Sequence, residues 1–238
     1  MKFRRKSSSP AASGDPAASA GSAESPESPE LPESTDLPEG TAHAEEPVPT
    51  GEPVGTGPYD ADELPAEAAT LERIDLGSLL IPPVEGLELR LQVEETTGEV
   101  AAVLLTNEEG ALELRAFAAP RGADLWGEVL PQLAADVQQR GGQVGEREGT
   151  FGRELVCQLG VALPDGEQGV QPSRIIGVNG PRWLLRATFL GRPAVEMEAG
   201  EAWEQVLRHV VVNRGRGAMP KGEALPLVIP ADARRVEG

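Results

Sequence analysis

The chain has very few of the side chains that most metal sites and catalytic sites use. Of its 238 residues, one is cysteine and two are histidine. A single cysteine, Cys157, excludes an intrachain disulfide and favours a reducing compartment, so we expect a cytoplasmic protein. One thiol and two separated imidazoles cannot supply the four converging ligands of a structural zinc site. Carboxylates alone could still bind a metal, but the chain has no EF-hand spacing. We assign no metal ligand and no cofactor.

Sequence motifs of catalysis are missing as well. The chain contains no G-x-S-x-G turn around a nucleophilic serine and no G-x-x-x-x-G-K-[ST] phosphate loop. Cys157 lies between Leu155 and Leu159 in an apolar run, where a free cysteine is usually a small buried hydrophobe. His209 comes at the end of a helical pattern and His43 in a stretch rich in proline and serine. We assign no catalytic residue, and whether the protein is an enzyme stays open, with the balance against it.

Long apolar runs are also absent. No stretch approaches the roughly 20 apolar residues that a membrane helix requires. The basic start, Met1 to Lys6, is followed by the small and polar residues 7–14 and by no apolar region of a signal peptide. We therefore expect neither membrane insertion nor export by that route.

Basic residues are missing from most of the first 70 residues. This segment has fourteen acidic and four basic side chains, a net charge of −10 out of −18 for the chain, and it holds half of the 22 prolines. Such a composition cannot bury enough apolar surface to offset its conformational entropy. We predict a disordered acidic tail over residues 1–70, a single domain over 71–230 and a short flexible tail over 231–238. The charge disfavours binding to nucleic acid or anionic membranes and is compatible with a protein partner that binds through the acidic tail.

The strongest structural signal in the domain is the stretch from Arg174 to Leu190. Two apolar runs flank Asn179-Gly180, a pair typical of β-hairpin turns. In the second run Trp183 shares one face with Leu185, Ala187 and Phe189, whereas Arg182 and Arg186 lie on the other face. The alternation predicts that Trp183 packs in the core.

The rest of the domain divides into strands and helices by its periodicity. Period-two patterns predict strands at residues 87–94, 111–118, 144–148, 154–161, 173–178 and 182–190, with a glycine-rich loop at 164–172. A run that is apolar on both faces predicts a further strand at 99–106. Period-3.6 patterns predict helices at 124–140, interrupted by Pro131, and at 194–209. Residues 210–212 either end the second helix or begin an extended segment, and residues 219–230 form an extended arm.

This order of elements defines the expected fold class. Three strands, a helix, four strands and a helix predict an α+β domain with a mainly antiparallel sheet and both helices packed over it. The order is also similar to that of Mog1/PsbP-type α/β/α sandwiches, an analogy at the level of the fold that carries no function.

Three arginines form the candidate interaction surface: Arg182, Arg186 and Arg208. The first hypothesis is a non-enzymatic interaction module with an acidic flexible tail. The alternative is a small-ligand-binding domain, or an unrecognised enzyme, with a pocket beside Arg182 and Arg186. Arg208 belongs to a local basic bias with Arg214, Arg216 and Lys221, for which we favour a solvated helix end and loop over a site for phosphates or acidic partners.

Five separated motifs, in order, carry a resemblance to a known family. They are the segments 74–78 with 81–82, 116–121, 152–155, 177–186 (Gly-Val-Asn-Gly-Pro-Arg-Trp-Leu-Leu-Arg) and 219–220 with 225–227. Over residues 59–230 the chain resembles domain-of-unknown-function family 3710 of actinobacteria. The resemblance implies a cytoplasmic protein and supplies no catalytic residues, because the family has no assigned activity.

Overall fold

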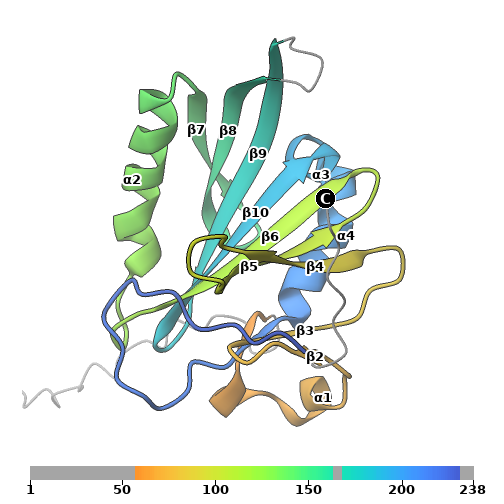
Figure 1. Ribbon diagram of the computed structural model, residues 1–238, viewed down its shortest axis with the longest axis vertical. Coiled ribbons are helices and arrows are strands. Elements are labelled where there is room, and N and C mark those ends of the chain that lie inside the picture. Colours follow the sequence, from red (N-terminus) through yellow and green to blue (C-terminus); the bar gives the residue numbers. More distant parts are fainter. Residues whose placement is uncertain (1–56, 163–167, 231–238) are drawn as a thin grey trace, which may run out of the picture. The chain divides into compact units, whose positions relative to one another are not determined.

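A seven-stranded antiparallel sheet is the centre of the protein, in a computed structural model that describes residues 57–162 and 168–230. The strand order is β4-β5-β6-β10-β9-β8-β7 (Figure 1). The bounds are Glu88–Val93 (β4), Val100–Thr106 (β5), Gly110–Ala118 (β6), Gln143–Gly149 (β7), Gly152–Ala162 (β8), Gln168–Asn179 (β9) and Trp183–Gly191 (β10). All seven expected strands are present, and the α+β class is confirmed.

Strand β10 occupies the middle of the sheet and pairs with β6 on one side and β9 on the other. Its side chains alternate between two cores, as expected from the sequence. Trp183 and Phe189 are 1% and 0% exposed in the larger core, whereas Leu184 lies in the smaller core on the opposite face. The turn before β10 requires Gly180, because a Cβ there would stand 2.1 Å from the Trp183 ring.

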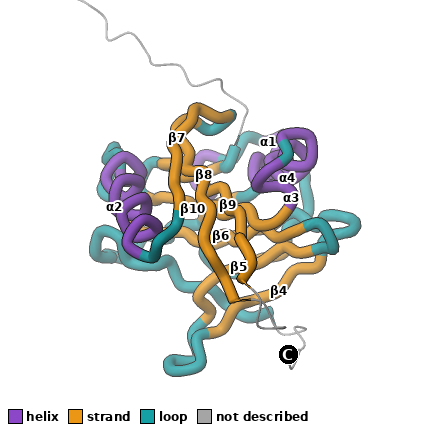
Figure 2. The backbone as a smooth tube through the Cα atoms, turned by 90° about the horizontal axis from the view of Figure 1, so that it is seen from above, coloured by secondary structure: helices purple, strands orange, loops and turns teal. Residues whose placement is uncertain are grey.

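The two long helices cover opposite faces of this sheet. Helix α2 (Leu125–Gln139) packs against β7, β8 and β9, and its Trp126 and Leu130 belong to the smaller core. Helix α4 (Met197–His209) lies on the other face, with Trp203 and Leu207 in the larger core. Figure 2 shows the sheet between them. Both helices pack on the sheet, and the tertiary structure adds that they do so from opposite sides.

Local signals set the ends of α2. The Asp124 carboxylate accepts a hydrogen bond of 2.8 Å from the Gly127 N–H, so Asp124 is the N-cap that the sequence predicts. The helix continues through Pro131, whose side chain is exposed. It ends before Gly141, where φ is +78°.

Two of the expected element bounds are wrong. The helix expected at 194–209 is two helices, α3 (Arg192–Val195) and α4, because Glu196 between them has the extended backbone angles φ −98° and ψ 121°. The loop expected at 164–172 is shorter, because residues 168–172 extend β9 and pair with the end of β8. Residues 163–167 of that loop lie outside the described part.

A second, small sheet was not expected. Its strand order is β1-β11-β3-β2, with the bounds Tyr59–Asp60 (β1), Ile74–Asp75 (β2), Leu79–Ile81 (β3) and Val211–Val212 (β11). Residues 61–69 add a 3-10 turn (Ala61–Glu63) and the short helix α1 (Ala66–Ala69). The ambiguous segment at 210–212 is therefore extended after Val210.

Ordered structure begins earlier than the expected boundary at residue 71. The Tyr59 N–H donates to the Val210 carbonyl at 2.9 Å, and the Trp183 indole donates to the Asp60 carboxylate at 2.6 Å. These long-range hydrogen bonds attach the polar segment 57–70 to the domain, which its composition alone does not predict. The expectation of disorder is therefore wrong for residues 57–70, and for residues 1–56 and 231–238 it lies outside the described part.

The segment 219–230 runs extended along the domain. Leu225 is 3% exposed in the larger core, and its N–H donates to the Ala116 carbonyl at 2.8 Å. Isolated bridges join Ala224 to Phe117 and Leu227 to Gly77. This arm closes the core at the edge where β6 ends.

Candidate functional site

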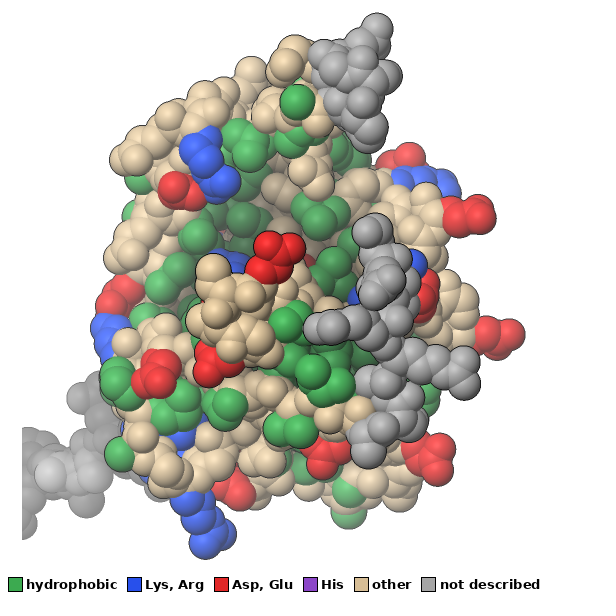
Figure 3. Space-filling view, viewed as in Figure 1, with side chains coloured by type: hydrophobic (Ala, Val, Ile, Leu, Met, Phe, Trp, Pro, Cys, Tyr) green, Lys and Arg blue, Asp and Glu red, His purple; other side chains and the backbone are tan. Residues whose placement is uncertain are grey.

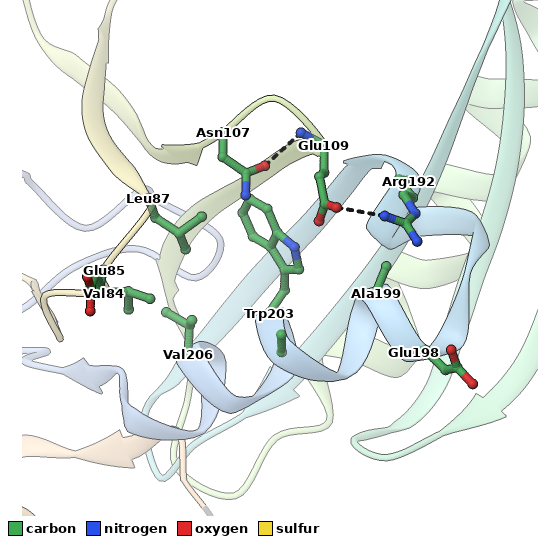
Figure 4. Close-up of a pocket in the computed structure, with 11 residues that line it drawn as sticks. Val84, Glu85, Leu87, Asn107, Glu109, Arg192, Glu198, Ala199, Trp203 and Val206 are labelled. Atoms are coloured by element: carbon green, nitrogen blue, oxygen red, sulfur yellow. Dashed lines mark hydrogen bonds and ion pairs between the residues drawn. The ribbon is translucent and has the colours of Figure 1, made fainter.

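A pocket of about 420 Å³ lies beside helix α4 (Figure 4). Four segments form it: helix α4, the start of α3, the loop that precedes β4, and the turn between β5 and β6. Its apolar wall consists of Val84, Leu87, Ala199, Ala202, Trp203 and Val206. This volume lies within the range of roughly 300–1,000 Å³ that is typical of small-ligand pockets.

The amphipathic pattern of α4 explains the apolar wall. Trp203 and Val206 are buried and belong to the larger core, whereas Ala199 and Ala202 face outward at the rim. Figure 4 shows Trp203 and Ala199 on α4 beside the turn that carries Asn107 and Glu109, and Trp203 itself is only 3% exposed. The adjacent Val195 and Met197 are 62% and 79% exposed, so the apolar surface continues beyond the pocket.

The polar rim of this pocket is built around Arg192. Its guanidinium donates to Glu109 at 2.6 Å and to Glu196 at 2.7 Å, and its backbone N–H donates to the Glu109 carbonyl at 3.0 Å. The hydrogen bond to Glu196, and then the charges of Glu196 and Glu109, raise the pKa of Arg192. Asn107 fixes the turn, since its side-chain oxygen accepts from the N–H groups of Glu109 and Gly110.

The rim carries an excess of negative charge. Arg192 is its one basic side chain, and two carboxylates already pair with it. Glu85 and Glu198 line the pocket in addition to Glu109. A more open hollow of about 730 Å³ adjoins the pocket through Leu87, Asn107 and Glu109 and adds Glu88 and Glu108. The site thus combines an apolar floor with an acidic rim.

A buried ion cluster ties α4 to the sheet. The Arg174 guanidinium, 4% exposed as a residue, donates to Glu204 of α4 at 2.6 Å and lies 3.6 Å from Glu154 of β8. It also stacks on the Phe189 ring, with Cζ 4.3 Å from the centroid. Glu154 is 1% exposed and pairs on its other side with Arg147.

Two glycines make room for this cluster. A Cβ at Gly200 would stand 2.9 Å from the Arg174 guanidinium, and one at Gly149 would stand 2.6 Å from the Glu154 carboxylate. The sequence reasoning missed the cluster. The signal was available, because Arg174 shares its strand face with Ile176 and Val178, a face that the alternation assigns to the core.

The structure does not bring the three candidate arginines together. Arg182 donates to the Gly215 carbonyl at 2.7 Å, in the loop before the C-terminal arm. Arg208 lies on α4, with Cζ 5.3 Å from the Phe151 ring centroid. Arg186 lies on the face of β10 opposite Trp183, where it pairs with Glu113 at 3.3 Å. None of the three lines the two pockets described above.

The thiol of Cys157 and the imidazole of His209 both contact neighbouring groups of the fold. Cys157 is buried, and burial raises the pKa of its thiol against a smaller opposing effect of a hydrogen bond with Ser173. His209 lies at the C-terminus of α4 and its Nδ1 is 2.7 Å from the Gln205 carbonyl. Among residues 57–162 and 168–230, no group of three or more His, Cys, Asp or Glu side chains could hold a metal ion. Within the same ranges, no helix has the length and apolar character needed to cross a membrane.

Most of the chain matches a known protein family. Residues 57–236 match the family described as "Protein of unknown function (DUF3710)". The chain belongs to this family. The matched region begins where the described fold begins, so the family unit includes the small sheet. No curated protein matches the chain.

Several solved chains match part of this DUF3710 protein, and one of them illustrates the likeness. It is a crystal structure from Bacteroides thetaiotaomicron VPI-5482, with 10% sequence identity and a TM-score of 0.34. The match covers 57% of this chain and 45% of that one, so this chain spans less than half of the relative's length. The Mog1/PsbP analogy stays a hypothesis.

Proposed function

We propose that this DUF3710 protein is a non-enzymatic interaction module of the cytoplasm whose docking site is the pocket beside α4. The observation that carries the proposal is the combination of an apolar floor, which includes Trp203, with a rim of Glu85, Glu109 and Glu198. An apolar centre surrounded by a polar rim is the usual anatomy of a protein–protein interface.

The charge of the site specifies the kind of partner. Because Arg192 is already neutralised by two carboxylates, an incoming basic side chain meets no repulsion at this rim. The partner is a protein segment with one or two apolar anchors flanked by Lys or Arg. The acidic composition of residues 1–56 adds to this preference, since their negative charge also attracts basic proteins over a Debye length of roughly 8 Å at physiological salt.

Ala202 offers a clean test, because it lines the pocket and its side chain is exposed. Ala202→Arg places a long cation at the pocket entrance and makes the rim less negative without entering the core. Ala135→Arg is the matched control, since Ala135 is an exposed alanine on α2, on the other face of the sheet.

The measurement is quantitative affinity capture with the full chain, followed by titration of the captured protein's basic segments as synthetic peptides. We expect a partner that Ala202→Arg loses and Ala135→Arg keeps, with a peptide affinity at least tenfold weaker for Ala202→Arg. Equal capture by both variants, or peptides that bind both equally, would refute the assignment of this pocket.

A further inference from the structure

Two arginines stand directly opposite each other on neighbouring strands of the large sheet. Arg115 of β6 and Arg186 of β10 are cross-strand partners in the antiparallel register. Side chains at such positions are adjacent, and like charges there repel. The pair lies on the face that carries α2 and opposite the face that carries Trp183.

The charges around this pair do not balance. Glu113 is the carboxylate that pairs with Arg186, at 3.3 Å, and both side chains are only partly exposed, at 19% and 23%. The Nε atoms of Arg115 and Arg186 are buried and have no hydrogen-bond partner among the described residues. Burial, and to a smaller extent the charge of Arg115, lowers the pKa of Arg186, whereas Glu113 raises it. Glu113 therefore pairs with Arg186, and Arg115 adds a second cation beside that pair.

An aromatic ring and a glycine shape the surroundings. The Cζ atoms of Arg115 and Arg186 lie 5.8 Å and 5.6 Å from the Phe117 ring centroid, so one ring orients both guanidinium groups. Gly177 stands beside Arg186 on β9, where a Cβ would stand 2.1 Å from the Trp126 ring of α2. On this side of the molecule Figure 3 shows a hollow beside α2 in which hydrophobic side chains gather.

We propose that Arg115 and Arg186 form a binding site for the carboxylate or phosphate group of a small molecule, with Phe117 as its apolar wall. Guanidinium groups bind both oxyanions through charge-assisted and often bidentate hydrogen bonds. An oxyanion between the two arginines offsets their mutual repulsion and supplies acceptors for donors that the protein leaves unpaired. This site is independent of the pocket beside α4 and lies on the other face of the sheet.

The test is a titration of the full chain, followed by NMR at the arginine Nε–Hε groups and by thermal unfolding. The probes are inorganic phosphate and acetate, which separate the two sources of the oxyanion, with chloride at the same ionic strength as the reference. The variants are Arg115→Gln and Arg186→Gln. Arg90→Gln is the control, because Arg90 is an exposed arginine of the same sheet whose partner is Glu88.

We expect phosphate or acetate to shift two Nε–Hε signals saturably and to raise the melting temperature beyond the effect of chloride. Arg115→Gln and Arg186→Gln should each weaken binding at least tenfold, and Arg90→Gln should leave it unchanged. Without the anion, Arg115→Gln should melt no lower than the natural protein, because it removes a repulsion. A response to both probes no larger than that to chloride, or saturable binding that survives in both glutamine variants, would overturn the site.

Discussion

Replacing Arg174 by methionine should destabilise this protein more than any other single removal of a charge from its described surface or core. The variant keeps an apolar side chain of similar length and removes the guanidinium, together with its stacking on the Phe189 ring. It leaves the Glu204 carboxylate without its 2.6 Å hydrogen bond and removes one of the two cations beside Glu154. Both carboxylates lie almost entirely out of water, at 10% and 1% side-chain exposure.

The expected magnitude follows from that burial. A charge that loses its partner in a protein interior typically costs about 3–5 kcal/mol, because its desolvation is no longer offset. For a domain of this size about 1 kcal/mol corresponds to about 2–4 °C, so the melting temperature should fall by about 6–20 °C. The matched control is Arg192→Met. Arg192 also holds two carboxylates, at 2.6 and 2.7 Å, but is 52% exposed, and surface pairs contribute only about 0–1 kcal/mol.

Urea unfolding at neutral pH, followed by tryptophan fluorescence, measures both variants. The double variant Arg174→Met with Glu204→Leu should recover most of the loss, because an apolar pair of similar volume can replace a buried ion pair at little cost. A loss below about 1 kcal/mol for Arg174→Met, or equal losses for Arg174→Met and Arg192→Met, would show that water reaches the cluster and that burial does not decide its energy.

Two further predictions concern the two cores. Trp183→Ala should lower the free energy of unfolding by about 3–5 kcal/mol, because the ring is 1% exposed. Trp183→Phe should lose mainly the hydrogen bond to Asp60, about 1 kcal/mol. Equal losses for the two variants in urea unfolding would contradict this prediction. Cys157 should react with a thiol reagent at least tenfold more slowly in the native protein than in urea at the same pH, because burial raises the pKa of its thiol and lowers the thiolate fraction at neutral pH. A native rate equal to the unfolded rate would place this cysteine at the surface.

Most of the long strands were predictable because their side chains follow a period of two, whereas β5 was predicted as a short apolar run between two turn signals. Trp183, Leu185, Ala187 and Phe189 point to one core in the structure as they do in the sequence pattern. The N-cap at Asp124 and the turn at Gly180 follow from side-chain chemistry that acts within a few residues. The small sheet was not predictable in this way, because its strands of two or three residues are too short to show a period.

The candidate sites depended on contacts that no local pattern contains. Arg186 was singled out from its position on β10, yet its cross-strand partner Arg115 is 71 residues away in the sequence, and only the β6–β10 register brings the two together. The pocket beside α4 escaped prediction altogether. Its wall joins α4 to the loop that precedes β4 and to the β5–β6 turn, and the break at Glu196 orients the start of α4 toward them.

By itself, the sequence determined the α+β class, the order of the long elements, the burial of Trp183 and the family. These properties arise from periodicity, turn chemistry and composition, which act over short distances along the chain. Only the tertiary structure decided that the two helices take opposite faces, that residues 57–70 belong to the fold, and that Arg174 is buried between two glutamates. The physical reason is that desolvation and charge pairing depend on which segments, distant in the sequence, are in contact. The pairing of β10 with both β6 and β9 determines those contacts.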